Sequence, residues 1–167
     1  DVVTCNPLAQ TNMKNTYSDL VEQTFYFPQE GFEVIDHNLN FYGIDLMEII
    51  KQYGTPLKIS YLPKIGSQIK KAKRIFNVAI AKNDYKGSYT YCYCTKSSHF
   101  SFILDEVLKH DVHLETSSAF DIDLIKSLYT SKKIDKNTVI ICNGFKRPQY
   151  IKGIADLINS GFNNVIT

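Results

Sequence analysis

The sequence predicts an α/β fold built on a parallel sheet, and three observations support that prediction. Strand-like segments begin near Ser88, Val112, Thr138 and Asn163, which places successive strands 24 to 26 residues apart. The segments between them have the periodicity of amphipathic helices. The first strand-like run, residues 89–94, consists mostly of aromatic and small residues, as is typical of a strand buried on both faces. Such regular alternation indicates right-handed strand–helix–strand units, which build parallel sheets.

Three helices are expected within this alternation. Over residues 100–108 the apolar residues follow the spacing i, i+3, i+4, i+7 and i+8. A second helix is expected over residues 122–129, after serines that suit a helix start. The third begins with Pro148 in its first turn and ends at Ser160-Gly161. Residues 165–167 form the last apolar strand.

Upstream of this alternation, local patterns predict smaller elements. Residues 32–42 are expected to form a short hairpin or extended pair. Residues 57–61 alternate apolar and polar side chains, as a half-buried strand does. A basic helix is expected over residues 65–76, and a loop over residues 83–87.

The chain is expected to divide into an N-terminal β/α segment, residues 13–52, and a larger domain, residues 53–167. Residues 1–12 have neither the basic start nor the apolar core of a signal peptide. Because Met13 introduces the first helix-like stretch, residues 1–12 are interpreted as a leader or upstream read-through.

The composition argues against several classes of protein. An apolar fraction of 44% and a charged fraction of 22% are ordinary for a soluble globular protein. A net charge of +2 gives no steering toward nucleic acid or membrane, and no run approaches the roughly 20 apolar residues that span a bilayer. The four cysteines suggest no disulfide framework or metal site. Cys92 and Cys94 are interpreted as core thiols in a reducing cytosol, so a cytoplasmic location is expected.

Lys96 is the candidate nucleophile. It follows the strand-like run and precedes the first helix of the alternation, so its ammonium group is expected at the carboxyl edge of the sheet. That edge is where α/β folds build their sites. Partial desolvation there would favour the neutral amine, which is the form that attacks aldehydes. The alternative is a strand-end lysine whose charge simply extends into water.

Several segments resemble one family of enzymes. Residues 93–98, Tyr-Cys-Thr-Lys-Ser-Ser, resemble the Tyr-x-x-Lys-x-Asn signature of the pyridoxal-phosphate decarboxylases with an alanine racemase-like barrel, with Ser98 in place of the usual asparagine. Residues 53–57 resemble that family's segment leading into the barrel, and residues 114–121 resemble its acidic-x-x-Ser-x-x-(Glu/Asp) element. Residues 142–146, Cys-Asn-Gly-Phe-Lys, are similar to a run typical of the arginine decarboxylases within the family.

This resemblance implies that residues 53–167 form the first half of a pyridoxal 5'-phosphate-binding (β/α)8 TIM-like barrel, preceded by the short β/α segment. A complete barrel has eight units and about 250 residues. The family's glycine-rich phosphate loop and the partner of the pyridine nitrogen would then lie outside this chain, which would have little activity alone. The alternative is a complete small doubly wound α/β domain, for which about 150 residues suffice.

The resemblance also implies site residues. Lys96 would carry pyridoxal phosphate as a Schiff base, and Glu115, at the end of the next strand, would lie beside the cofactor. Asp121 and Asn143 are the other cofactor-binding candidates. Each has a plainer alternative: a solvated strand-end carboxylate at Glu115, a capping box closed by Asp121 at a helix start, and a simple strand-to-helix turn at Asn143 and Gly144.

The implied function is decarboxylation of L-arginine to agmatine in polyamine biosynthesis, by a homo-oligomer in its full-length form. The alternatives are a decarboxylase of ornithine, lysine or diaminopimelate, and a non-catalytic α/β binding module. A binding module could use the basic stretch over residues 64–74 to contact nucleic-acid phosphates. A solvated helix face is the simpler interpretation of that stretch, so neither nucleic acid nor membrane is expected as a partner.

Overall fold

The computed structural model describes residues 30–167, which belong to two compact units; along the chain the first ends at Ile59 and the second begins at Ser60. The expectations for residues 1–12, for the helix-like stretch after Met13 and for Cys5 lie outside the described residues. The two units are treated separately below.

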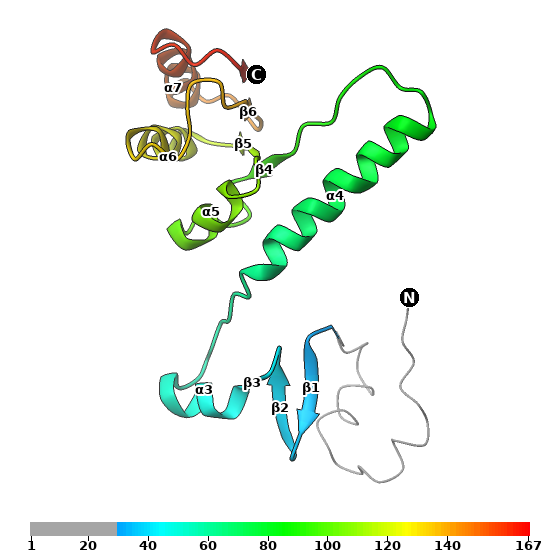
Figure 1. Cartoon of the computed structure of the whole chain (residues 1–167). Helices are drawn as coiled ribbons and strands as arrows, with labels where there is room; N and C mark the ends of the chain where they lie inside the picture. The colour runs from blue at the N-terminus through cyan, green and yellow to red at the C-terminus, as the bar shows by residue number, and fades with distance from the viewer. Residues whose placement is uncertain (1–29) are drawn as a thin grey trace. The chain divides into compact units, whose positions relative to one another are not determined.

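The described part of the first unit is a small antiparallel sheet followed by a helix (Figure 1). The sheet has the order β1 (Phe32–Ile35), β2 (Asn38–Phe41) and β3 (Ile44–Asp45), and α3 (Leu46–Tyr53) follows it. Asp45 caps α3 because its Oδ1 accepts a hydrogen bond from the Met47 backbone N at 2.7 Å. The hairpin predicted over residues 32–42 is confirmed.

The second unit alternates helices and strands along the chain. Its elements are α4 (Pro63–Lys82), β4 (Cys92–Cys94), α5 (Ser101–Leu108), β5 (His113–Thr116), α6 (Ala119–Thr130), β6 (Ile140–Cys142), α7 (Pro148–Asn159) and β7 (Val165–Ile166). The four strands are parallel and lie in the order β4-β5-β6-β7. The predicted mixed α/β fold with a parallel sheet is confirmed.

The four strands show no reversal of their order within residues 60–167. In a doubly wound sheet the order reverses at a switch point, and helices cover both faces. Here each strand pairs with the next one in the chain, as consecutive strands of a (β/α)8 barrel do. Helices α5, α6 and α7 lie to one side of the strands (Figure 1).

The two faces of this sheet are buried to different degrees. Side chains alternate between faces along a strand, and the register aligns those that share a face. On the helix-covered face, Leu114, Thr116, Ile140 and Cys142 are buried. On the opposite face the side chains are half-buried, and we call this the half-buried face. Its residues are Cys92, Cys94, His113, Glu115 and Ile141.

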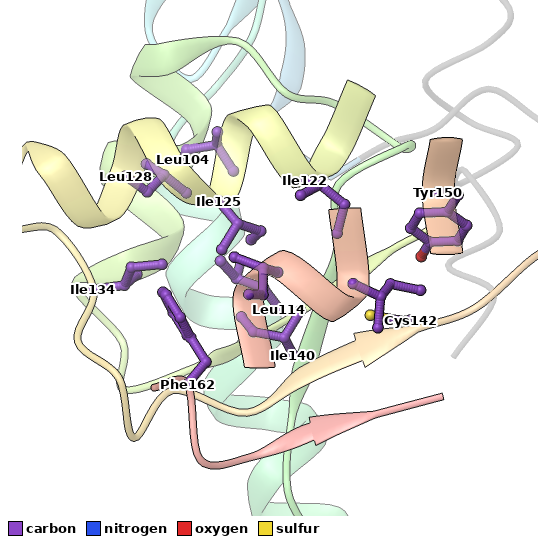
Figure 2. Packing of buried hydrophobic residues seen from close by; sticks show 12 residues of the cluster. Leu104, Leu114, Ile122, Ile125, Leu128, Ile134, Ile140, Cys142, Tyr150 and Phe162 are labelled. Atoms are coloured by element: carbon purple, nitrogen blue, oxygen red, sulfur yellow. The ribbon is translucent and has the colours of Figure 1, made fainter. Parts of the chain in front are cut away.

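The main core fills the space between the helix-covered face and the helices (Figure 2). Leu114 and Ile140 from neighbouring strands pack with Ile122 and Ile125 of α6, and none of these four side chains is more than 1% exposed. Burying an aliphatic side chain of this size contributes about 1.5–3 kcal/mol. The apolar residues that repeat at helical spacing in the sequence therefore face the sheet and pack against it.

A second apolar cluster joins α4 to α5. Ile69 of α4 is 2% exposed and packs with Ile103, Val107 and Val112. Polar contacts hold the same junction, since the Nζ of Lys73 donates to the His110 carbonyl oxygen at 3.0 Å. The N-terminal half of α4 is thereby fixed to the βα units that follow it.

One local expectation is wrong, and two elements form with other bounds than expected. Residues 57–61 form no strand, because a strand needs a hydrogen-bonding neighbour and the structure gives this segment none among residues 30–167. The predicted strand over residues 89–94 is reduced to β4, which is half-buried rather than buried on both faces. Helix α4 continues to Lys82, six residues beyond the expected end at residue 76.

No helix within residues 30–167 is long and apolar enough to cross a membrane.

Candidate functional site

Three of the four predicted site residues lie at the carboxyl edge of the second sheet. Lys96 is two residues beyond the end of β4, Glu115 is the third residue of β5, and Asn143 directly follows β6. The parallel register aligns Cys94 with Glu115, and Glu115 with Ile141, so the three strands end side by side. Strand alternation places Glu115 on the half-buried face.

The turn that carries Lys96 is fixed to the neighbouring strand. Thr95 is fully buried, and both its backbone N and its Oγ1 donate to the Glu115 carbonyl oxygen at 3.0 Å. Lys96 itself is exposed. The described residues therefore do not supply the desolvation that was expected at this lysine. They supply a fixed backbone from which the amine extends.

The residues on either side of Lys96 hold the turn from within. The Ser97 backbone N and Oγ donate to the Cys94 carbonyl oxygen at 3.2 and 2.7 Å. The Tyr93 hydroxyl donates to the Ser98 carbonyl oxygen at 2.9 Å. The tyrosine and the final serine of the Tyr-x-x-Lys-x-Ser run are thus hydrogen-bonded to each other across the turn that carries the lysine.

Glu115 and Asn143 contact each other directly. The Asn143 Nδ2 donates to the Glu115 Oε1 at 3.1 Å, and the Asn143 Oδ1 accepts from the Gly144 backbone N at 2.7 Å. The Asn143 backbone N donates to the Thr116 carbonyl oxygen at 2.9 Å and extends the β5–β6 pairing by one residue. Since both ends of the amide are engaged, its orientation follows from the network.

Gly144 allows the loops after β5 and β6 to approach closely. Its φ of +82° lies in the region that favours glycine, and an added Cβ would be 2.8 Å from the Ser117 carbonyl oxygen. The strand-to-helix turn predicted at Asn143 and Gly144 is therefore present. Asn143 contributes to it while its Nδ2 contacts Glu115.

Asp121 has a different environment from the other three residues. It is 3% exposed at the start of α6, and its Oδ2 accepts from the Ser117 and Ser118 backbone N atoms at 2.7 and 3.0 Å and from both serine hydroxyls at 3.2 Å. The capping alternative is confirmed. A cofactor-binding role for Asp121 stays a prediction.

Cys92 lies on the same face of the sheet as Glu115. Burial raises the pKa of the Cys92 thiol, and the negative charge of Glu115 raises it further. Cys92 therefore remains a neutral thiol rather than a reactive thiolate. Within residues 30–167, no three His, Cys, Asp or Glu side chains are arranged to hold a metal ion.

His99 is exposed and precedes α5 by two residues. Its ring makes an edge contact with Phe120 at a centroid distance of 5.4 Å. Phe120 and Phe145 are 62% and 83% exposed. Exposed aromatic rings thus follow β5 and β6 just beyond the polar residues of the site.

Lys146 was given no role by sequence reasoning, yet it contacts the loop that carries Asn143. Its Nζ donates to the Cys142 and Gly144 carbonyl oxygens at 2.6 and 3.1 Å. A lysine two residues after a strand-end Asn-Gly pair is a weak signal for such a contact. The structure of the loop is needed to show that the Lys146 side chain points back toward the preceding residues.

A hollow of about 420 Å³ lies at the opposite end of the sheet. Its lining includes Val112, which directly precedes β5, and Thr138, which lies two residues before β6. The charged residues Lys132 and Asp135 also line it. No sequence pattern predicted this hollow. It is distinct from the edge that carries Lys96.

Comparison with known proteins gives a consistent but distant relationship. The chain is 25% identical over 141 residues to the biosynthetic arginine decarboxylase of Prochlorococcus marinus, with 78% of this chain covered. It is 24% identical to the biosynthetic arginine decarboxylases of Geobacter sulfurreducens and Trichlorobacter lovleyi, over 134 and 133 residues. The chain spans about a fifth of the length of these curated relatives. No family model matches it.

Proposed function

We propose that this chain is the part of a pyridoxal-phosphate-dependent arginine decarboxylase that carries the cofactor lysine, Lys96. The observation that carries the proposal is the convergence of Lys96, Glu115 and Asn143 at one edge of the parallel sheet, with a hydrogen bond between the last two. The distant similarity to arginine decarboxylases supports the substrate class.

The donor set at this edge fits pyridoxal phosphate. An exposed primary amine on a hydrogen-bonded turn suits a cofactor that is held through an aldehyde carbon. When bound, pyridoxal phosphate serves as an electron sink and so supplies the decarboxylation chemistry. Lys96 would hold the cofactor, and the Glu115 carboxylate, oriented by Asn143, would favour a protonated nitrogen close to it.

The remaining contacts of such a site are proposed to come from the rest of a longer protein. The sequence has no Gly-x-Gly-x-x-Gly or Walker-type loop to hold a phosphate. The half-buried face would then be the interior of a (β/α)8 barrel, with β4 to β7 as consecutive strands. A cytoplasmic homo-oligomer is part of the same proposal.

In the proposed reaction, L-arginine loses its α-carboxyl group as carbon dioxide, a proton replaces it on the α-carbon, and agmatine is released. The run at residues 142–146 is the feature that favours arginine over ornithine, lysine or diaminopimelate. Substrate preference is therefore part of the test.

The test is release of carbon dioxide from carboxyl-labelled arginine by the intact protein that carries this sequence. Lys96→Ala is expected to reduce the release to background. Lys152→Ala, which removes an exposed lysine from α7, is expected to leave it unchanged. Near-normal turnover by Lys96→Ala would contradict the proposal, and faster release from ornithine, lysine or diaminopimelate would contradict the substrate.

The rival binding module gains no support from α4. Lys73, near the end of the basic stretch, donates to the His110 carbonyl oxygen and pairs with the Asp111 carboxylate at 3.5 Å. The positive charge of Lys73 is therefore paired within the second unit. The stretch is not a continuous row of cations available to phosphates.

A further inference from the structure

We propose that Lys146 is a positioning residue that holds Asn143 against Glu115, and its meaning for catalysis rests on the proposed function. The two carbonyl groups that accept from its Nζ belong to Cys142 and Gly144, at 2.6 and 3.1 Å. These are the residues on either side of Asn143. One ammonium group therefore fixes the backbone before and after the asparagine.

The Lys146 side chain is itself held from a second direction. Its Nζ lies 5.4 Å from the centroid of the Tyr150 ring, within the range of a cation–π contact. Tyr150 is 1% exposed, and its hydroxyl is hydrogen-bonded to the Thr116 Oγ1 at 2.8 Å. A buried, anchored ring on α7 thus supports the ammonium group of a half-buried lysine.

The backbone that Lys146 fixes carries the partner of the Asn143 amide. Gly144 has a φ of +82°, and its backbone N donates to the Asn143 Oδ1 at 2.7 Å. The other end of that amide, Nδ2, donates to the Glu115 Oε1 at 3.1 Å. A shift of Gly144 would therefore rotate the amide and weaken its contact with the carboxylate.

The loop is exposed, which separates this role from a general contribution to folding. Asn143, Gly144 and Phe145 are exposed, so water can solvate the Gly144 carbonyl group if the lysine is removed. Loss of the ammonium group is expected to loosen the loop without unfolding the sheet. The change should be largest at the Asn143 side-chain amide.

The experiment measures by NMR how fast the Asn143 side-chain amide protons exchange with water in the chain without cofactor. An Asn143→Ala spectrum assigns the signal. Lys146→Met is expected to accelerate the exchange roughly three- to tenfold, as loss of one hydrogen bond would. Lys146→Arg, which keeps a cationic donor, is expected to restore slow exchange. Lys152→Met on α7 removes the same charge from an exposed site and is expected to change nothing.

Unchanged amide exchange in Lys146→Met would overturn the inference, even if its thermal midpoint fell, because the lysine would then only stabilise the unit. Equal acceleration in Lys152→Met would also overturn it. Should Lys146→Met fail to fold, Lys146→Gln, which keeps an amide donor of reduced reach, is expected to give intermediate exchange. The measurement needs no cofactor, so failure of the arginine assay would contradict the proposed function and leave this result standing.

Discussion

At the carboxyl edge of the second sheet, side chains are oriented by backbone groups of the same loop or of the neighbouring strand. The Asn143 Oδ1 accepts from the Gly144 backbone N, and its Nδ2 is thereby directed at Glu115. Glu115 in turn uses its carbonyl oxygen to hold Thr95, next to Lys96. These connections between neighbouring strands bring the candidate site residues together.

Asp121 is expected to be a stability residue. Replacing it with alanine removes the acceptor of two backbone N–H groups and two hydroxyl groups near the buried start of α6. We expect Asp121→Ala to lower the free energy of unfolding in urea by about 1–3 kcal/mol.

Asp123, on the same helix, gives a matched control. Its side chain is 81% exposed and lies 4.0 Å from the Lys126 Nζ. Asp123→Ala is expected to change the stability by less than about 0.5 kcal/mol. Equal losses of unfolding free energy in the two variants would show that the buried capping interactions of Asp121 do not contribute more than an exposed carboxylate.

Tyr150 is expected to make the folding stability depend on pH in the alkaline range. Burial raises the pKa of its phenol from 10.0 to about 12, against a smaller lowering by the hydrogen bond with Thr116. Between these values the unfolded chain loses the Tyr150 proton while the folded chain keeps it, so folding stability falls as the pH rises. The contribution is complete below pH 10 and is lost as the pH approaches 12.

Tyr150→Phe isolates this contribution. The variant lacks the hydrogen bond with Thr116, so it should be less stable than the unmodified chain below pH 10. The difference between their urea midpoints is expected to shrink as the pH rises toward 12. A difference that stays constant through this range would contradict the assignment.

At the scale of elements, the sequence was most informative where periodicity is long. The helices over residues 100–108, 122–129 and 148–159 repeat apolar positions over two or more turns, and each of them forms. Residues 57–61 show a strand pattern just as clear, but a strand depends on a partner elsewhere in the chain. Local pattern could not supply that partner, which is why this prediction failed.

The junction between α4 and α5 is expected to depend on Ile69. This side chain is 2% exposed and packs with Ile103, Val107 and Val112. Ile69→Ala should lower the free energy of unfolding in urea by about 2–5 kcal/mol, because it leaves a cavity at the junction.

Ile75 on the same helix tests whether the loss comes from packing. It is 52% exposed, so Ile75→Ala should change the stability by less than about 0.5 kcal/mol. A similar loss in both variants would contradict the assignment of the effect to the α4–α5 cluster, because alanine is a better helix former than isoleucine and helix propensity cannot cause the loss.

At the scale of the whole molecule, the parallel direction of β4 to β7 was predictable, and the connections within the candidate site were not. The spacing of the strands along the sequence indicates their number and direction. The contact of Asn143 with Glu115 depends on strand register, and that of Lys146 with its own loop depends on the positive φ of Gly144. These are properties of tertiary structure that residue types do not encode locally.

The central claim is that the carboxyl edge of this sheet presents Lys96 to pyridoxal phosphate. The most direct test incubates the chain with pyridoxal phosphate, reduces the adduct with borohydride and maps the labelled lysines by peptide mass. We predict that Lys96 carries most of the label and that Lys96→Arg abolishes this selectivity while labelling of Lys152 is unaffected. Label spread evenly over the exposed lysines of the unmodified chain would contradict the claim.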